Sequence, residues 1–533
     1  MLEQQYKVLV KEKIADSGVN MLRERFSVDV GVDWTDEELA ERIGGYHGIL
    51  IRSATQLDAG LIERAGNLKV IGRAGIGVDN VDVLAATKRG IIVANAPQSN
   101  IVAAAEHTIA LMLALARNVP QAHASLTAGR WERSRFGGVE VYEKTLGVLG
   151  FGRIGQLVAA RARALGMRVV VYDPFVSAER CRELQVTSGS LENVLLQADF
   201  VTLHAPLTDD TRNLINADRL HLMNRGVRIV NAARGDLVDL DALVDALESG
   251  QVGGAALDVF PAEPYTSGRI LELPNVVVTP HLGASTHEAQ DRAGVIVAEQ
   301  VAAALTGEFV SNAVNIPHVG AEDMEVLGPY IPLATRLGQL VAGLSGGGFD
   351  RVDVTCAGAL AEHDTRLVTQ AVLAGVFGAL SDEPVNLVNA RAVAESRGID
   401  VGEERTRTPG DYTNLVRVAC GREASAAGTT IGREQRPWLV EVDGYRVEIE
   451  LAPAHLLVMM NDDTPGMIGQ VGMMFGKEGV NISNMSVSRS GKGKRDAVMV
   501  LAVDHDPTPE ALERLQELGG IHRVRLVTVD GRT

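Results

Sequence analysis

The chain has 533 residues, with 51 Lys and Arg against 68 Asp and Glu, so its formal net charge is −17. At roughly 150 residues per domain, this length predicts three or four domains. The acidic balance argues against a nucleic-acid binder, whose footprint would be a basic patch. Cys181, Cys356 and Cys420 are odd in number and far apart, which excludes a disulfide framework or a C-x-x-C metal site. With no apolar run near the ~18 residues of a membrane span, we expect a protein of the reducing cytoplasm.

Up to residue 318 the sequence alternates short apolar runs with amphipathic stretches, the pattern of parallel strands covered by helices. The first strands are predicted at residues 6–10, 48–51, 69–72 and 91–94. A long helix over residues 103–118 and a loop over residues 129–138 separate them from a second series. That series contains predicted strands at residues 145–149, 168–172, 200–204, 228–232, 254–259 and 276–279. Such a run fits a complete doubly wound nucleotide-binding sheet.

Beyond residue 318 the pattern changes. Residues 319–453 mix strands and helices around a glycine-rich stretch, 343–348, that predicts a turn. From residue 456 a strand, a helix, two strands, a helix and a strand follow in turn, which is the ferredoxin-like βαββαβ order. The basic segment Lys492–Arg495 falls between the second and third strands of this module, so a solvated hairpin turn is favoured over an anion site.

Gly150-Phe-Gly152-Arg-Ile-Gly155 is the only G-x-G-x-x-G in the chain, and it lies between a predicted strand and a predicted helix. The glycines allow a close approach to a pyrophosphate, and the helix amino terminus points free N–H groups at the anion. The next predicted strand ends at Asp173, whose carboxylate can accept hydrogen bonds from a ribose diol and repel a 2′-phosphate. The motif therefore predicts NAD rather than NADP. A plain strand-to-helix turn and a helix N-cap at Asp173 are the structural alternatives.

Arg234, Glu263 and His281 follow three later strands, in the segments NAARG, DVFPAEP and PHLG. The carboxyl ends of parallel strands meet at one edge of the sheet, where such folds bind ligands. There an Arg can clamp a carboxylate, a His can take a hydroxyl proton and a Glu can fix the imidazole tautomer, a set suited to oxidation of a 2-hydroxy acid. Taken singly, Arg234 also fits a surface loop and His281 a structural turn. His281 and His287 fit no metal-ligand spacing and have no nearby cysteine, so no metal is expected.

These segments, with VYDP, HAPLT and PHLGAST, resemble the D-isomer-specific 2-hydroxyacid dehydrogenase family, and NDDTPGMIGQVG and GVNISNMSV resemble an ACT regulatory domain. The resemblance implies an α/β fold with two doubly wound parallel-sheet domains (substrate and Rossmann NAD domains), followed by an α+β intervening domain and a ferredoxin-like ACT domain. The implied bounds are 1–98 with 283–317, 99–282, 318–453 and 454–533. The positions that match the family's NAD-binding motifs are Gly150, Gly152, Arg153, Ile154, Gly155, Asp173, His204, Ala232, Arg234, Asp258 and His281.

Within the family, IRSAT (51–55), GRAGIGVDNVD (72–82) and WERSRF (131–136) resemble members that act on a phosphorylated substrate. The resemblance implies NAD-dependent oxidation of 3-phospho-D-glycerate to 3-phosphohydroxypyruvate, the first committed step of L-serine biosynthesis. It gives His281 the acid/base role, Glu263 the support of that histidine, and Arg234 the orientation of the substrate. The further substrate positions it implies are Arg52, Ser53, Arg73, Gly75 and Arg133, the last reaching across a dimer; a solvated surface charge is the alternative for each arginine. Ile76 departs from the family, which commonly has a hydroxyl residue there.

The ACT-like segment implies a small-molecule sensor, because ACT domains bind amino acids between paired modules. The positions that match the effector site are Asn461, Asp463 and Asn481. L-Serine is the implied effector and a homotetramer, or at least a homodimer, the implied assembly; a purely structural assembly domain is the alternative. For the whole chain the alternatives are another D-2-hydroxy-acid dehydrogenase, of the glycerate type, and a non-catalytic NAD-sensing corepressor. No nucleic-acid or membrane partner is expected.

Overall fold

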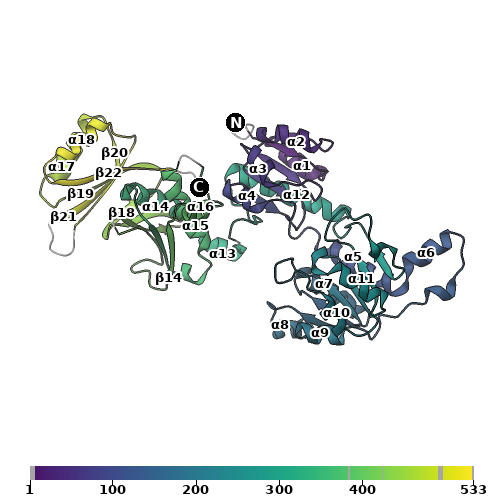
Figure 1. The fold of residues 1–533 in the computed structure, drawn as a ribbon. Coiled ribbons are helices and arrows are strands. Elements are labelled where there is room, and N and C mark those ends of the chain that lie inside the picture. Colours follow the sequence, from purple (N-terminus) through teal and green to yellow (C-terminus); the bar gives the residue numbers. More distant parts are fainter. Residues whose placement is uncertain (1–5, 318, 382–383, 423, 490–495, 531–533) are drawn as a thin grey trace.

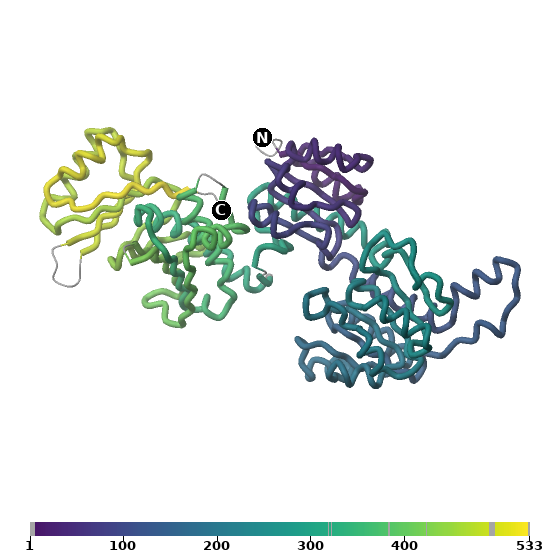
Figure 2. The backbone as a smooth tube through the Cα atoms, viewed as in Figure 1, coloured from purple at the N-terminus to yellow at the C-terminus, as the bar shows by residue number. Residues whose placement is uncertain are grey.

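The computed structural model describes residues 6–317, 319–381, 384–422, 424–489 and 496–530, so the turn expected at Lys492–Arg495 lies outside the described residues. Four β-sheets organise the described chain, with five, seven, six and four strands in chain order. Figure 1 shows the four units in an extended arrangement, in which the five-stranded unit lies between the seven-stranded unit and the two carboxyl-terminal units. The path of the backbone between the units can be followed in Figure 2.

The first unit is a parallel sheet in the order β2-β1-β3-β4-β5. Its elements are β1 (Lys7–Val10), α1 (Asp16–Arg23), β2 (Ser27–Val30), α2 (Asp36–Arg42), β3 (Gly48–Ile51), α3 (Ala59–Arg64), β4 (Val70–Arg73), α4 (Val83–Lys88) and β5 (Ile92–Asn95). The sequence did not predict β2, because the edge segment SVDV is mostly exposed and contains no apolar run. α12 (His287–Thr306) returns from later in the chain and buries Val297 and Val301 in one apolar cluster with Val8 and Val10.

The second unit is a parallel sheet in the order β12-β11-β10-β9-β6-β7-β8. Its strands are β6 (Thr145–Leu149), β7 (Arg168–Tyr172), β8 (Thr187–Ser188), β9 (Phe200–Leu203), β10 (Val227–Asn231), β11 (Val252–Leu257) and β12 (Val276–Val278). Its helices are α5 (Ile101–Arg117), α6 (Val119–Thr127), α7 (Arg153–Ala164), α8 (Ala178–Glu183), α9 (Leu191–Gln197), α10 (Ala217–Leu222) and α11 (Leu240–Glu248). All the strands predicted here are present, and β8 is an addition at the sheet edge. The strand order reverses between β6 and β9, which makes their carboxyl ends the ligand-binding switch point.

An arm projects from the second unit (Figures 1 and 2) and contains α6 and the short 3₁₀ helix Arg133–Phe136. On it, Trp131 is 81% exposed and Leu126 is 57% exposed. Large apolar side chains exposed on one projecting segment are typical of a contact surface. In the described part of the chain no single helix is long and apolar enough to cross a membrane; α5 and α6 meet that length and composition only as a pair bent by 64°.

The third unit is a sheet in the order β14-β13-β15-β16-β17-β18 with long helices against it. Its elements are α13 (Ala321–Leu327), α14 (Tyr330–Ser345), β13 (Arg351–Gly358), α15 (Arg366–Leu380), α16 (Ala390–Ser396), β14 (Asp400–Thr406), β15 (Asn414–Cys420), β16 (Ala424–Ile431), β17 (Arg436–Val442) and β18 (Tyr445–Glu450). The turn predicted at residues 343–348 is wrong in its first half, because α14 continues through Gly343 to Ser345 and is capped by Gly346, with φ 68°. Gly343 stays in the helix for packing: a Cβ there would lie 2.6 Å from the Val527 side chain.

The fourth unit is an antiparallel sheet in the order β20-β21-β19-β22, and its βαββαβ element order confirms the sequence prediction. Its elements are β19 (Ala454–Asp462), α17 (Met467–Lys477), β20 (Ile482–Arg489), β21 (Asp496–Val503), α18 (Pro509–Glu517) and β22 (Ile521–Val529). Leu340 of α14 shares one buried apolar cluster with Val458, Val500 and Val527 of this sheet. The third and fourth units therefore have a common core. The whole arrangement confirms the predicted fold class of two parallel-sheet units, an α+β unit and a ferredoxin-like unit.

Candidate active site

The turn from β6 to α7 carries the G-x-G-x-x-G motif and is closely packed. Gly150 has φ 93°, and a Cβ there would lie 2.6 Å from the backbone nitrogen of Ala205. At Gly155 a Cβ would lie 2.3 Å from the Gly150 carbonyl oxygen, whereas around Gly152 the space is open. Within the described structure α7 has no side-chain cap, so its first N–H groups are left for an anion. With Arg153 and Ile154 in the first turn of α7, these residues fit the pyrophosphate of NAD.

Asp173 follows β7 beside this turn. Its carboxylate accepts the Phe151 N–H at 2.7 Å on Oδ2 and the Phe175 N–H at 2.9 Å on Oδ1. Each oxygen still has a lone pair for a ribose hydroxyl, so the position fits its predicted role. His204 follows β9 and packs against the same turn, and burial lowers its pKa to about 4. Its imidazole is therefore neutral at physiological pH.

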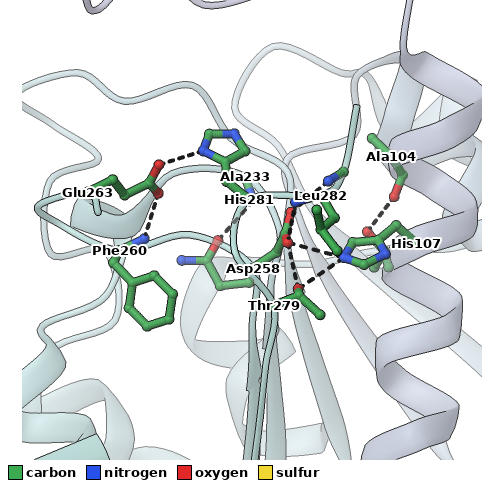
Figure 3. A network of polar contacts seen from close by, with 12 residues as sticks. Ala104, His107, Ala233, Asp258, Phe260, Glu263, Thr279, His281 and Leu282 are labelled. Atoms are coloured by element: carbon green, nitrogen blue, oxygen red, sulfur yellow. Dashed lines mark hydrogen bonds and ion pairs between the residues drawn. The ribbon is translucent and has the colours of Figure 1, made fainter. Parts of the chain in front are cut away.

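His281 lies in the turn after β12 and has φ 55°, an uncommon left-handed conformation for a residue with a side chain. Its Nδ1 lies 2.7 Å from Glu263 Oε2, and Glu263 Oε1 accepts the Phe260 N–H at 3.0 Å (Figure 3). Partial burial acts to raise the pKa of Glu263, but the hydrogen bonds from His281 and Phe260 outweigh it, so the pKa is lowered. The ionised carboxylate holds Nδ1, which leaves Nε2 as the nitrogen that can exchange a proton.

Arg234 follows β10 and reaches the first unit, where its Nε donates to Asp79 Oδ2 at 3.2 Å. Next to it, Gly235 packs so closely on Phe260 that a Cβ would lie 2.0 Å from the Phe260 carbonyl carbon. Because Phe260 also donates to Glu263, the loops that carry the three predicted catalytic side chains form one continuous set of contacts. The structure therefore brings these side chains to one edge of the sheet.

Asp258 and Ala232, both predicted as cofactor positions, follow β11 and β10 at that edge. The Asp258 carboxylate is fully buried beneath the turn after β12. Its Oδ1 accepts the Leu282 N–H at 2.7 Å, and its Oδ2 accepts the Gly283 N–H at 2.8 Å. Burial acts to raise the pKa of Asp258, but hydrogen bonds to its carboxylate, from His107 first, lower it. Asp258 therefore supports the turn, a function that its motif did not reveal.

Arg52 and Arg73 lie at the carboxyl ends of β3 and β4 in the first unit. The Arg73 Nε is buried and, within the described residues, has no hydrogen-bond partner. Burial and then the charge of Arg234 lower the pKa of Arg73 to about 10. Gly75 leaves room for this side chain, because a Cβ there would lie 1.7 Å from Arg73 Nη1. A buried donor without a partner beside two further arginines is suited to a multiply charged anion.

Glu12 organises the loop that carries Arg52 and the exposed Ser53. Its Oε1 accepts the N–H of Arg52 at 2.8 Å and of Thr55 at 2.9 Å, and Asn80 donates to the carbonyl oxygens of the same two residues. Sequence reasoning missed Glu12, because the residues it binds are 40 and 43 positions away and no local pattern marks it.

A small pocket continues from Arg52 and Gly75, and its polar lining also includes Lys13, Ser99, Asn100 and Gln290. Within the described residues, the buried Oδ1 of Asn100 has no partner. These side chains come from the loop after β1, the segment before α5 and the helix α12. No motif singled them out, since only the return of α12 onto the first sheet brings them together.

Arg133 is exposed on the projecting arm, not in the cleft of its own chain. The three predicted effector positions are also separated within one chain. Asn461, near the end of β19, pairs with Ala497 near the start of β21, and Asp463 directly follows β19. Asn481 precedes β20, whose first residue pairs with the last residue of β21. Asn461 and Asp463 therefore lie at one end of the β20–β21 pair and Asn481 at the other.

Among the described residues, Asp462, Asp496 and His522 offer ligand atoms within 4.8 Å of one another. His522 Nε2 lies 2.9 Å from Asp462 Oδ1, so an ion pair already accounts for two of the three. The side chains are partly or fully exposed, and exposed acidic groups of this kind are common without a metal. We assign no metal to them.

Fold and site together define a class of protein. A doubly wound sheet with a glycine motif at its switch point, and with an Arg, a Glu and a His at the same edge, is the arrangement of an NAD-dependent dehydrogenase acting on hydroxy acids. Residues 109–283 match the family described as D-isomer specific 2-hydroxyacid dehydrogenase, NAD binding domain. The cofactor is therefore NAD. Residues 326–443 match the D-3-phosphoglycerate dehydrogenase intervening domain, and residues 455–520 match the ACT domain.

Similarity to known proteins extends over nearly the whole chain. D-3-phosphoglycerate dehydrogenase of Archaeoglobus fulgidus is 43% identical over 97% of this chain and 98% of its own length. The Methanocaldococcus jannaschii protein of the same name is 42% identical over 98% of this chain and 100% of its own length, and the Bacillus subtilis protein is 37% identical over 98% and 99%. The chain belongs to the D-3-phosphoglycerate dehydrogenase family.

Solved structures resemble the first two units. The TT0316 protein of Thermus thermophilus superposes with a TM-score of 0.54 and 39% identity, over 58% of this chain and 99% of that one. D-Lactate dehydrogenase of Aquifex aeolicus, solved with NAD and lactic acid, gives a TM-score of 0.52 and 29% identity over 58% of this chain and 98% of its own. These two proteins thus share the fold in which the candidate site lies.

Proposed function

We propose that this protein oxidises 3-phospho-D-glycerate to 3-phosphohydroxypyruvate with NAD, the reaction that commits this metabolite to L-serine synthesis. The observation that carries the proposal is the convergence of Arg52, Arg73 and Arg234 beside the His281–Glu263 pair, in a chain whose net charge is −17. Three cations gathered in an otherwise acidic protein favour a substrate with more than one negative group. The full-length relatives that carry the name D-3-phosphoglycerate dehydrogenase support the same substrate.

The residues of the cleft divide the chemistry among them. Arg234 holds the substrate carboxylate and so orients the carbon that bears the hydroxyl. The Nε2 atom of His281 takes the hydroxyl proton as the C–O double bond forms, and Glu263 stabilises the imidazolium through Nδ1. When bound, NAD supplies the acceptor for the hydride that leaves the same carbon. The proton and the hydride together account for the two hydrogens removed.

The phosphate group distinguishes this substrate from glycerate. We assign Arg52 and Arg73 to the phosphate on the far carbon of a substrate held by Arg234, because the charges of Arg234 and Arg52 both act on Arg73. With glycerate the buried Nε of Arg73 would stay without a partner, and an unsatisfied buried donor costs about 1–3 kcal/mol. A phosphorylated substrate is therefore preferred over the glycerate-type alternative.

We assign residues 1–98 with 283–317 to a discontinuous substrate-binding domain, 99–282 to the NAD domain, 318–453 to the intervening domain and 454–533 to the ACT domain. The return of α12 onto the first sheet supports the discontinuous assignment. We also place the protein in the cytoplasm, since its three cysteines are buried and free, as in a reducing compartment.

The test of activity is NADH formation by the purified full chain with 3-phosphoglycerate, glycerate or D-lactate. We expect kcat/KM to be at least about 100-fold higher for phosphoglycerate, since two charge-assisted contacts of roughly 1.5–3 kcal/mol each are lost with glycerate. Equal kcat/KM for phosphoglycerate and glycerate would transfer the protein to the glycerate-type alternative. Absence of turnover with every acid, despite NADH binding, would favour the corepressor.

We further propose a homodimer, assembled into a homotetramer, and L-serine as an effector. The projecting arm with exposed Trp131 supports a contact between copies in which Arg133 enters the partner's cleft. For serine, Asn461 and Asp463 would face Asn481 of a second copy, because pairing of two β20 edges about a two-fold axis joins opposite ends of the strands.

Light scattering and inhibition kinetics test these two proposals separately. We expect a tetramer for the full chain and a fall of turnover on adding L-serine, which Asp463→Ala abolishes without changing the uninhibited rate. A monomer by light scattering would contradict the assembly. Unchanged turnover with serine, together with no heat of binding in titration calorimetry, would leave the fourth unit as a purely structural domain.

A further inference from the structure

A second histidine lies beneath the turn that carries His281. His107, on α5, places its Nε2 3.2 Å from Asp258 Oδ1 and 3.1 Å from Thr279 Oγ1 (Figure 3). The Thr279 hydroxyl in turn lies 2.5 Å from the same Asp258 oxygen. Three side chains from α5 and from the ends of β11 and β12 therefore meet under the turn. The roles described so far assign nothing to His107 or Thr279.

Hydrogen-bond roles determine the tautomer of His107. The ionised Asp258 carboxylate can only accept, and the single proton of the Thr279 hydroxyl is directed to it at the shortest distance. Nε2 of His107 must then carry a proton and donate it to the two oxygens that it faces. Without that proton, three acceptors would meet in a buried space, which is strongly unfavourable.

Asp258 determines the position of His281. Its carbonyl oxygen accepts the His281 N–H at 2.9 Å, while its carboxylate accepts the N–H groups of Leu282 and Gly283. His281 is held in a left-handed conformation, φ 55°, that a non-glycine residue keeps only when the surrounding bonds over-determine it. A rotation of the Asp258 carboxylate would release this turn. His107 and Thr279 are the side chains that oppose such a rotation.

We propose that His107 and Thr279 are positioning residues for the dehydrogenase reaction. They hold the Asp258 carboxylate in one orientation, and through it the turn that presents the His281 imidazole to the substrate hydroxyl. The inference rests on the proposed function, because it assumes that His281 is the group that exchanges the proton. Substrate affinity does not depend on His107, since Arg52, Arg73 and Arg234 are carried by other loops.

The experiment compares kcat, KM and NADH affinity for paired variants of the full chain. His107→Ala and Thr279→Val remove the donors, and we expect kcat to fall about 10- to 100-fold, as for a displaced reacting group. KM for the hydroxy acid and NADH affinity should change less than about threefold, since binding and positioning separate in this way. His107→Gln and Thr279→Ser keep a donor and should recover most of the rate. His221→Ala, exposed on α10 and outside the cleft and the arm, is the matched control and should behave as wild type.

Three outcomes would overturn the proposal. The first is an unchanged kcat in both His107→Ala and Thr279→Val. The second is an equal loss in His107→Gln, which keeps the donor. The third is a fall of kcat matched by a rise of KM and loss of NADH binding, which would reveal a purely structural role. If wild type oxidises another hydroxy acid instead of phosphoglycerate, the proposed substrate fails while the same variants measured on that acid still decide this inference.

Discussion

The turn after β12 has an open side and a buried side, and each carries a histidine–carboxylate pair. On the open side, the His281 and Glu263 side chains are 43% and 34% exposed. On the buried side, the His107 and Asp258 side chains are 19% and 1% exposed. Asp258 uses both of its oxygens on the protein, whereas His281 keeps one ring nitrogen for an outside partner. The same pair of residue types thus gives chemistry on one side and support on the other.

The arginines of the molecule show the same difference. Arg417 of the third unit is held by two hydrogen bonds to both carboxylate oxygens of Glu441. Arg73 of the first unit has a buried Nε for which the described residues offer no acceptor. Where hydrogen-bonding capacity is used within the protein, the residue stabilises the fold. Where it is left unused in a buried place, as at Arg73, the group needs a partner that the described residues do not supply.

The largest effect is expected from breaking the histidine–carboxylate pair on the open side of the turn, His281 and Glu263. His281→Ala should lower kcat about 10²-fold or more, because a positioned general base contributes that much to the rate. Steady-state NADH formation checks this, with the melting temperature as a control for folding. A variant that turns over near the wild-type rate would remove His281 from its role and with it the distinction between the two sides.

Removal of Arg73, whose buried Nε has no acceptor among the described residues, should change KM rather than kcat. Arg73→Ala should raise KM for phosphoglycerate about 10- to 100-fold, the equivalent of one charge-assisted contact of roughly 1.5–3 kcal/mol. The same variant should leave KM for glycerate nearly unchanged, which serves as the internal control. Equal increases for both acids would mean that Arg73 does not meet the phosphate.

Glu263→Gln should weaken the His281–Glu263 pair without removing the imidazole. We expect kcat to fall about tenfold, less than the ~10²-fold or more expected for loss of the general base itself. The lowered pKa of Glu263 gives this variant a pH signature as well. The carboxylate contributes stability above its ordinary pKa of 4.5, and that contribution is lost as pH falls through the lowered value in the folded protein. The difference in free energy of unfolding between wild type and Glu263→Gln should therefore shrink below about pH 4.5.

Denaturant unfolding of both proteins between neutral pH and pH 3 measures this difference. The effect is small, because the Glu263 side chain is about one-third exposed and solvent screens the pair. A difference that grows toward acid would contradict the assigned direction of the shift.

The smallest effect is expected at Glu12, which holds the Arg52 loop much as Asp258 holds the His281 turn. Glu12→Gln keeps one acceptor oxygen but loses the charge, and Glu12→Ala loses both. We expect KM for phosphoglycerate to rise a few-fold in Glu12→Gln and more in Glu12→Ala, because Glu12 acts on Arg52 only through the backbone of its loop. A change in kcat with constant KM would mean that Glu12 affects the chemical step and not the binding of the substrate.

Local patterns in the sequence were sufficient for much of the fold. The apolar runs of the second unit predicted six of its seven strands, all except β8. The glycine motif lies at the predicted turn between a strand and a helix, from β6 to α7. β2 was not predicted, because an exposed edge strand needs no apolar face. The start of the glycine stretch 343–348 was misread, since glycine in a helix can serve close packing as well as a turn.

The candidate site divides in the same way. Arg234, Glu263 and His281 each follow a predicted strand, so their meeting follows from the rule that parallel strands end at one edge. No motif marks Glu12, Asn100 or His107. Glu12 meets Arg52 because β1 and β3 are neighbouring parallel strands, and His107 meets Asp258 because α5 packs against β11. Asn100 lines the small pocket from the segment before α5.

By itself, the sequence determined the order of the units, the NAD motif, the three catalytic candidates and the ferredoxin-like module, because period, spacing and strand ends are local properties of a chain. Only the tertiary structure decided which groups are left with unused hydrogen-bonding capacity. It buried the Nε of Arg73 without an acceptor among the described residues, bonded the Asp258 carboxylate to the His281 turn, and placed Asn481 away from Asn461. The physical reason is that burial and partnership depend on distances between segments, which folding sets and no single segment contains.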